Sequence, residues 1–426
     1  MEFHAHQRTV GGAIMMTVAS VRSKLFNEKR VEESNKLLLA LCILFGLSSS
    51  LQKFGVFDIM NKGIIGLLCL ITLALFCQRP QPKTSFLILS MTAMLHAIAF
   101  AFPVSSKEGI ATYFMFAFWV LFWLYVLCNV GDFIKVAYRS RRFLWRVLTL
   151  WTAVTTVSFF LPMCYKLGWG GTRYFTSFTT DSFEVAPVAL FMLSLNILLY
   201  TFDRNKVKAL LFSIVPLACV FAAGTRTYLV VVAVEFIILL RLMVRSRGAF
   251  AALFTVCVVC FVGIAAISNI GQKFESATLD TASDMSVFLE VFTNGRSEFW
   301  AVDMEAFLAS DWFTMLFGHG FSYVYELNQS AIGMRLYAHN DFINLLLNFG
   351  IVGLSVYFAV FVPVLAKLKS KCGLLVCLLF GFMWLFNAFF NMLYVYVIAV
   401  IGMGVIAMAL LSADVVSDER EEVVSS

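Results

Sequence analysis

Charged residues are scarce in this sequence. Only 14% of its 426 residues are Asp, Glu, Lys or Arg, against about 25% in an average soluble domain. There is no P-loop, no glycine-rich dinucleotide turn and no D-x-D cluster, so the common signatures of nucleotide and nucleotide-sugar binding are missing. The seven prolines are scattered, and the paired broken helices of many transporters are not evident.

Apolar residues dominate instead. They make up 61% of the chain, with 45 phenylalanines, which predicts an all-α polytopic membrane protein. The net charge of +6 is then interpreted through the loops that hold the positive residues, since these loops indicate the orientation in the membrane. We expect no nucleic-acid partner. Cys257 and Cys260 form a C-x-x-C inside an apolar run with no partner pattern, so we interpret them as buried thiols without a metal or redox role.

The apolar runs divide the chain into about twelve candidate membrane spans, since a helix needs about 20 residues to cross the bilayer core. We predict a polar segment over 1–36, a transmembrane domain over 37–412 with one large loop over 269–338, and a tail over 413–426. The candidate spans are 37–52, 59–77, 85–103, 110–128, 144–163, 183–202, 207–223, 227–243, 249–268, 339–366, 373–391 and 393–412.

Basic residues orient these spans. With the N-terminus in the cytoplasm, the cytoplasmic segments include "QRPQPK", "YRSRRFLWR", "DRNKVK", "RLMVRSR" and "KLKSK", and hold most of the 32 Lys and Arg residues. This is the expected positive-inside bias. Both termini are therefore predicted to be cytoplasmic, with the 269–338 loop between spans nine and ten outside. His4 and His6 are interpreted as solvated tail residues.

Few cations remain on the outer side, which makes each of them informative. Arg226 lies in "AAGTRTYLV" at the outer end of a span, Arg296 lies in "FTNGRSEFW" in the large loop, and His339 opens the tenth span. Two guanidiniums meeting at one membrane face are able to hold a phosphate or pyrophosphate through forked hydrogen bonds. Arg173 and Arg335 are weaker candidates, interpreted as solvated loop residues.

His339 is the candidate general base. We expect the helix dipole at the start of the tenth span to keep the imidazole neutral, so that it accepts a proton from a hydroxyl. Asn340 and Asp341 follow it and are candidates to orient the ring or a substrate. Asn294 or Ser297 is expected to cap the helix near Arg296.

Ordinary structural interpretations of the same residues stay open. His339 is also interpretable as an interfacial anchor, Arg226 as a snorkelling anchor, and Arg296 as the partner of Glu298 or Asp303 in a solvated loop. The choice among these depends on whether the three cations come together in space.

The tenth span carries further polar residues and two glycines. Asn340, Asn344 and Asn348 recur every four residues and share one helix face, which must contact other protein or a wet cavity. Interhelical hydrogen bonding is the structural alternative to a functional role. Gly350 and Gly353 permit close helix packing. Glu235 is a deep charge in the eighth span whose role the sequence leaves open.

Taken together, these motifs resemble the O-antigen ligase and polymerase superfamily of bacterial inner-membrane glycosyltransferases. The resemblance rests on H-N-x9-G-x-x-G at His339, Asn340, Gly350 and Gly353, with "GTRTYLV", "GRSEFW" and "GHGF" in support. It implies a GT-C-like fold. It also implies that Arg226 and Arg296 hold the pyrophosphate of an undecaprenyl-pyrophosphate-linked glycan, while His339 activates the acceptor hydroxyl and the anomeric centre is inverted without metal or cofactor.

Within this superfamily we favour a polymerase that joins lipid-linked repeat units at the periplasmic face of the inner membrane. The main alternative is a ligase that transfers the finished glycan to lipid A-core. Membrane lipids, a chain-length regulator and a flippase are the further partners that the resemblance implies. A polysaccharide flippase or other transporter would instead require ionisable residues along a continuous path through the membrane, and a structural scaffold would not need the histidine and both arginines.

Overall fold

The predicted spans are helices in the computed structural model, which describes residues 28–79, 81–102, 107–167, 173–244, 246–267 and 295–412. Within these ranges, seven helices are long and apolar enough to cross a membrane, as expected of an all-α membrane protein. The number of twelve crossings and the GT-C-like topology remain predictions. The helices that overlap the predicted spans are residues 28–49, α2 (Val56–Gln78), α3 (Lys83–Ala99), α4 (Lys107–Arg139), α5 (Arg141–Ser158), α6 (Ser182–Asp203), α7 (Lys206–Ala223), α8 (Arg226–Met243), α9 (Arg247–Ile267), α15 (Asp341–Cys372), α16 (Leu374–Asn391) and α17 (Val397–Leu411).

Several helices extend beyond the apolar windows. The first described helix already includes residues 28–36, and α15 continues six residues past the predicted end at 366. Helical hydrogen bonding continues beyond the last apolar residue of a span. Hydropathy therefore predicts the apolar part of a helix better than it predicts the residues at which the helix begins and ends. The segments 1–27 and 413–426, with His4 and His6, lie outside the described residues.

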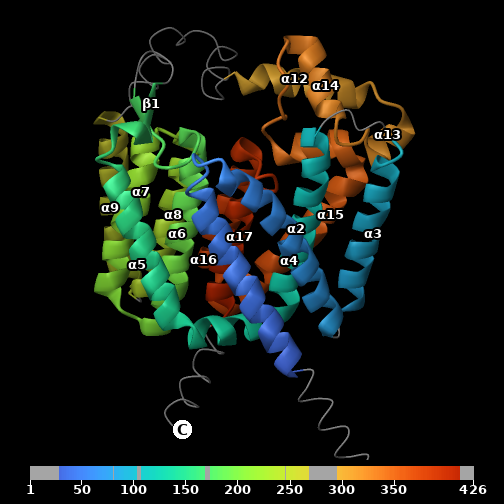
Figure 1. Ribbon diagram of the computed structural model, residues 1–426. Helices are drawn as coiled ribbons and strands as arrows, with labels where there is room; N and C mark the ends of the chain where they lie inside the picture. The colour runs from blue at the N-terminus through green and yellow to red at the C-terminus, as the bar shows by residue number, and fades with distance from the viewer. Residues whose placement is uncertain are drawn as a thin grey trace, which may run out of the picture.

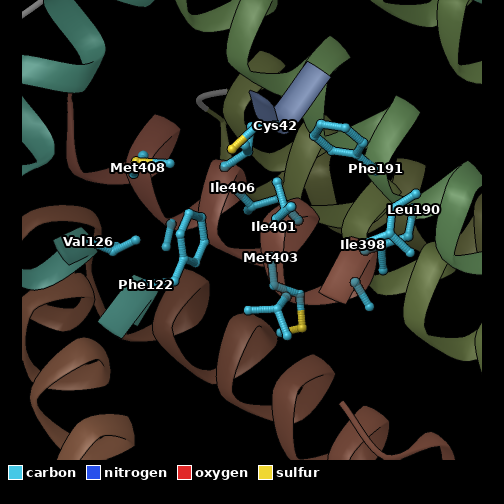
Figure 2. Packing of buried hydrophobic residues seen from close by; sticks show 14 of the residues in the cluster. Cys42, Phe122, Val126, Leu190, Phe191, Ile398, Ile401, Met403, Ile406 and Met408 are labelled. Atoms are coloured by element: carbon cyan, nitrogen blue, oxygen red, sulfur yellow. The ribbon is translucent and has the colours of Figure 1, made fainter. Parts of the chain in front are cut away.

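Helix α17 forms the centre of the bundle. Every residue that it contributes is buried, and it packs against α6, α4 and α15. A Cβ atom on Gly404 would lie 2.3 Å from Cε1 of Phe122, so only glycine allows α4 to approach this closely. Figure 2 shows this core, with α17 side chains between those of α4 and α6. The residues labelled there are Cys42, Phe122, Val126, Leu190, Phe191, Ile398, Ile401, Met403, Ile406 and Met408.

One end of the bundle carries a cap of short elements (Figure 1). The part of the large loop that the structure describes folds into α12 (Arg296–Leu308), α13 (Trp312–Phe317) and α14 (Tyr323–Ile332). At the same end, β1 (Tyr165–Leu167) pairs antiparallel with β2 (Arg173–Phe175), a small departure from the predicted all-α fold. The connection from α4 to α5, which is rich in arginine, lies at the opposite end. This arrangement agrees with the predicted orientation, which remains a prediction.

A kink in α15 connects the cap to the bundle. Gly350 interrupts the helix with φ 65° and ψ −165°, a conformation that essentially only glycine adopts. Two carbonyl groups of α15 just before the kink accept hydrogen bonds from the "GHG" turn at residues 318–320. The His319 amide donates to the Leu347 carbonyl at 2.8 Å, and the Gly320 amide donates to the Asn348 carbonyl at 3.2 Å.

Gly350→Ala should therefore be strongly destabilising. The new Cβ would lie 2.3 Å from the Leu316 carbonyl carbon in α13, and the backbone would be strained as well. We expect a loss of about 3 kcal/mol or more, measured as unfolding of the purified protein in detergent. Gly333→Ala is the control, because Gly333 also has a positive φ but nothing lies within 4 Å of its added Cβ. Equal losses for the two variants would contradict the close packing of α13 on α15.

Candidate functional site

Arg226 and Arg296 both lie at the end of α16 that meets the cap, and "outer" is used below for this capped end of the bundle. Arg226 is the first residue of α8, and the hydroxyl of its neighbour Thr227 donates to the Asn391 side chain at the end of α16. Arg296 is the first residue of α12, and its guanidinium donates to the Phe390 carbonyl. Two residues 70 positions apart in the chain are thus anchored to adjacent residues of one helix end.

His339 is joined to the same place through α12. The Trp300 indole donates to the Ala338 carbonyl at 2.7 Å. Trp300 lies one helical turn after Arg296 on α12, so this bond ties the residue before His339 to the start of α12. The Trp300 ring also meets the Phe389 ring edge-on, with centroids 5.1 Å apart. The outer ends of α8, α12 and α16 and the segment leading into α15 therefore meet at one place.

The His339 imidazole and the two guanidiniums are linked electrostatically through Arg296. Burial lowers the pKa of His339 to about 4, and the neighbouring Arg296 charge acts in the same direction. Burial also lowers the pKa of Arg296. The neighbouring Tyr396 raises this pKa, and the charge of Arg226 lowers it further. The imidazole is therefore neutral at ordinary pH beside two guanidiniums, which favours binding of an anion next to a proton acceptor.

The predicted reason for the neutral imidazole was incomplete. His339 does not open the helix: α15 begins at Asp341, Asn340 is its N-cap, and His339 precedes both with φ 52°. Burial, and after it the charge of Arg296, lower the pKa of the imidazole in the structure. Among the described residues no hydrogen bond reaches the imidazole, which leaves both ring nitrogens open to a substrate.

Asn340 and Asp341 shape the site without bonding to the ring. The Asn340 side chain accepts from the amides of Phe342 and Ile343 at 2.9 and 3.2 Å, a standard N-cap. Asp341 is fully buried and points toward the bundle, where the Tyr357 hydroxyl donates to it at 3.4 Å. Both residues thus fix the start of α15.

The asparagine stripe faces protein rather than lipid. Asn344 and Asn348 are buried, and Asn344 donates to the hydroxyl of Tyr394, which lies between α16 and α17. Asn348 interacts with the same hydroxyl. The structure therefore gives these side chains a role in packing α15 against the α16–α17 connection, the structural alternative named above.

Three tyrosines near the guanidiniums were missed by sequence reasoning. Tyr174 of β2 interacts electrostatically with Arg226, and Tyr228 and Tyr396 interact with Arg296. Their hydroxyls are suited to donate to an anion held by the arginines. No spacing rule relates these positions, and only their aromatic character at outer segment ends could have suggested them.

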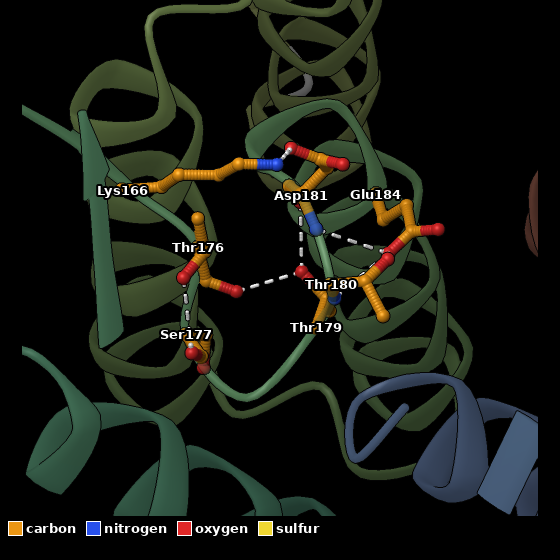
Figure 3. A network of polar contacts seen from close by, with 7 residues as sticks. All are labelled: Lys166, Thr176, Ser177, Thr179, Thr180, Asp181 and Glu184. Atoms are coloured by element: carbon orange, nitrogen blue, oxygen red, sulfur yellow. Dashed lines mark hydrogen bonds and ion pairs between the residues drawn. The ribbon is translucent and has the colours of Figure 1, made fainter. Parts of the chain in front are cut away.

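A network of polar contacts holds the hairpin that carries Tyr174 (Figure 3). Lys166 of β1 forms an ion pair with Asp181 at 2.6 Å. Asp181 and Glu184 make the reciprocal capping box that starts α6, and Glu184 also accepts from the Thr180 hydroxyl. The hairpin is thus joined to the outer end of α6, so that its position relative to Arg226 is fixed.

The remaining candidates lie apart from the cluster or have structural partners. Arg173 and Arg335 are exposed, as solvated residues would be. Glu235 is buried in α8, where the Ser194 hydroxyl of α6 donates to it at 2.7 Å. Gly295, which has a left-handed backbone, is the N-cap of α12 in place of Ser297, and Asn294 lies outside the described residues. No ion pair joins Arg296 to Glu298 or Asp303 in the described part of the chain, because Arg296 turns inward to α16.

An apolar groove of about 750 Å³ runs between α7 and α9, with Phe236 of α8 also lining it. Its upper end is formed by Phe221 and Ala222, the last turn of α7, from which the chain turns through Gly224 directly into Arg226. The groove also contains the free thiols of Cys257, which is half-buried, and Cys260, which is exposed, so the interpretation of both as buried thiols was wrong. The remaining lining residues are Phe159, Ile214, Leu217, Ala218, Val256, Phe261 and Ile264.

These features define a helical membrane protein with a capped, cationic site at one end of its bundle. A family model described as O-antigen ligase matches residues 209–358, which include Arg226, Arg296 and His339. The match confirms the resemblance to the O-antigen ligase and polymerase superfamily and indicates a function of that type, with glycan and lipid substrates. No curated protein matches the chain.

Proposed function

We propose that the protein transfers a glycan from an undecaprenyl pyrophosphate to a hydroxyl acceptor, at the periplasmic face of a bacterial inner membrane. The observation that carries this proposal is the meeting of Arg226, Arg296 and His339 at the outer end of α16. A lipid pyrophosphate is already activated, so the site needs charge stabilisation on the leaving group and one base.

In the proposed reaction, the neutral His339 imidazole takes the proton of the acceptor hydroxyl as its oxygen attacks the anomeric carbon. The bond from that carbon to the pyrophosphate oxygen breaks, and the anomeric centre is inverted. Arg226 and Arg296 compensate the charge that develops on the departing pyrophosphate. Tyr228 and Tyr396, which interact with Arg296, are placed to donate further hydrogen bonds. No step requires a metal ion or cofactor.

For the acceptor, we propose the growing chain of repeat units, which makes the protein a polymerase. A ligase that uses lipid A-core is the second candidate, because the matching family model is described as O-antigen ligase. Glycan banding in a deletion strain separates them. A core carrying a single repeat unit supports the polymerase, whereas loss of the whole ladder with unlinked polymer retained supports the ligase. An unchanged ladder would contradict both.

The groove between α7 and α9 suits the lipid part of such a donor. It is apolar throughout, and its upper end adjoins Arg226, so that a chain lying in it would bring its pyrophosphate to the guanidinium. Bilayer lipid is as apolar as the groove, so binding there gains shape complementarity more than hydrophobic free energy. We therefore expect the groove to orient the donor and to contribute moderately to affinity.

Filling the groove should weaken donor binding. Ala218→Trp places a large ring among the lining residues, and we expect about three- to tenfold weaker binding of undecaprenyl pyrophosphate, measured by native mass spectrometry. Leu211→Trp is the matched control, since Leu211 lies on the same helix, is exposed and does not line the groove. If both variants bind as the unsubstituted protein does, the lipid lies elsewhere.

A transporter remains the alternative from another class. It would need ionisable groups along a path through the bundle. The deep carboxyl of Glu235 instead accepts a hydrogen bond from Ser194, while the cationic groups gather at one end. This distribution favours chemistry at a surface site over passage through the membrane.

A further inference from the structure

The segment that carries His339 is held from three sides. The Asn328 side chain donates to the Leu336 carbonyl at 3.1 Å, the Trp300 indole donates to the Ala338 carbonyl, and Asn340 caps α15. His339 itself has a left-handed backbone, which a non-glycine residue keeps only when its surroundings impose it. The position of the imidazole therefore depends on these three anchors.

Asp303 is related to two of these anchors: it lies on the same helix as Trp300 and interacts with Asn328. It falls seven residues after Arg296 and three after Trp300, so all three share one face of α12. Its side chain is fully buried. The carboxyl group lies close enough to the Asn328 amide to interact with it, although neither carboxyl oxygen accepts a hydrogen bond of ordinary geometry. Asp303 is thus placed beside the side chain that holds the Leu336 carbonyl.

The surroundings of Asp303 are unsuited to a charge. A small core of Phe307, Val324, Ala338 and Leu347 fills the space between the cap and α15. No cation pairs with Asp303 among the described residues, and an unpaired buried carboxylate is costly. Burial raises the pKa of Asp303 to about 7, and the Asn328 amide opposes this only in part.

Of the other titratable groups near α12, one faces Asp303 and the rest are directed elsewhere. Tyr323 of α14 interacts electrostatically with Asp303. His319, in the turn before α14, bonds to Ser310. The acidic side chains of Glu298 and Glu305 on α12, and of Glu326 on α14, are exposed. On the α15 side, Asp341 interacts with Tyr357, and His339 with Arg296.

We propose that Asp303 is a positioning residue that acts in its neutral form, through Asn328 and the Leu336 carbonyl, to hold the His339 imidazole in place. Its role rests on the proposed function of His339. Ionisation of Asp303 would draw water into the small core and loosen the segment, and His339 would lose its alignment with the acceptor. The folded protein then holds a proton that the unfolded chain releases near pH 4, so stability declines as the pH rises from there through about 7.

The test compares Asp303→Asn and Asp303→Leu in the full-length protein in nanodiscs, with an undecaprenyl-pyrophosphate-linked oligosaccharide as donor. The neutral amide of Asp303→Asn should keep activity within about threefold and remove the decline above pH 7, whereas Asp303→Leu should lower kcat about tenfold or more with KM for the donor unchanged. Glu305→Gln, an exposed carboxyl on the same helix, should keep the pH profile of the unsubstituted protein.

A second measurement does not depend on transfer. Amide hydrogen exchange over residues 336–340, corrected for its intrinsic pH dependence, should accelerate in Asp303→Leu, and above pH 7 in the unsubstituted protein but not in Asp303→Asn. An alkaline decline that persists in Asp303→Asn, or unchanged exchange in Asp303→Leu, would overturn the positioning role. The expected exchange pattern in a protein that transfers no glycan would support the positioning role and contradict the proposed function instead.

Discussion

Replacing His339 with alanine should abolish glycan transfer while leaving the protein inserted and folded. The imidazole makes no hydrogen bond within the described chain, and the left-handed backbone at this position is held by neighbouring residues, so its removal takes away chemistry more than structure. Loss of a general base typically costs ~10²–10⁴-fold in rate. The measurement is single-turnover transfer with purified protein, after equal thermal unfolding of the two proteins has been established.

Donor binding provides the control for this variant. Because Arg226 and Arg296 remain, His339→Ala should bind undecaprenyl pyrophosphate about as well as the unsubstituted protein. Normal polymer, or normally capped lipid A, in cells that carry only His339→Ala would reject the catalytic role of His339. Weak binding together with lost activity would instead assign His339 to donor recognition.

Arg226→Lys should be nearly as damaging as removal of the side chain. A lysine keeps the positive charge but loses the planar fork that binds two phosphate oxygens at once. We expect transfer to fall about tenfold to hundredfold, with a rise in KM for the donor as part of the effect. The measurement is steady-state transfer with varied donor concentration.

The matched substitution for comparison is Arg335→Lys, at an exposed position of the same outer side. It should change transfer by less than about twofold, as is usual for a solvated surface residue. If Arg226→Lys proves equally harmless, Arg226 serves as a snorkelling anchor, and the forked contact with pyrophosphate is wrong.

The helices and the candidate residues were accessible from sequence because both depend on local patterns. Each apolar window overlaps a helix, since hydropathy over about 20 residues reflects one helix crossing at a time, although several windows run past the helix ends. Arg226, Arg296 and His339 were selectable because a cation is rare on the outer side of such a chain. The predicted alternation of spans places the start of α8 and the end of α16 at one face, and α12 contacts that end of α16 in the structure.

Features that depend on tertiary contacts were not accessible in this way. The interruption of α15 at Gly350 arises where α13 crosses it, and nothing within the helix sequence specifies that crossing. The left-handed conformation of His339 depends on bonds from α12 and α14. No local pattern relates Tyr174 to Arg226, because the hairpin that brings them together is held in place by contacts with the start of α6.

The bonds between the "GHG" turn and α15 bear on the biogenesis of the protein. The turn leaves the ribosome before α15, yet its amides of His319 and Gly320 have their acceptors on α15. The cap is therefore complete only after the translocon has released that later helix into the bilayer.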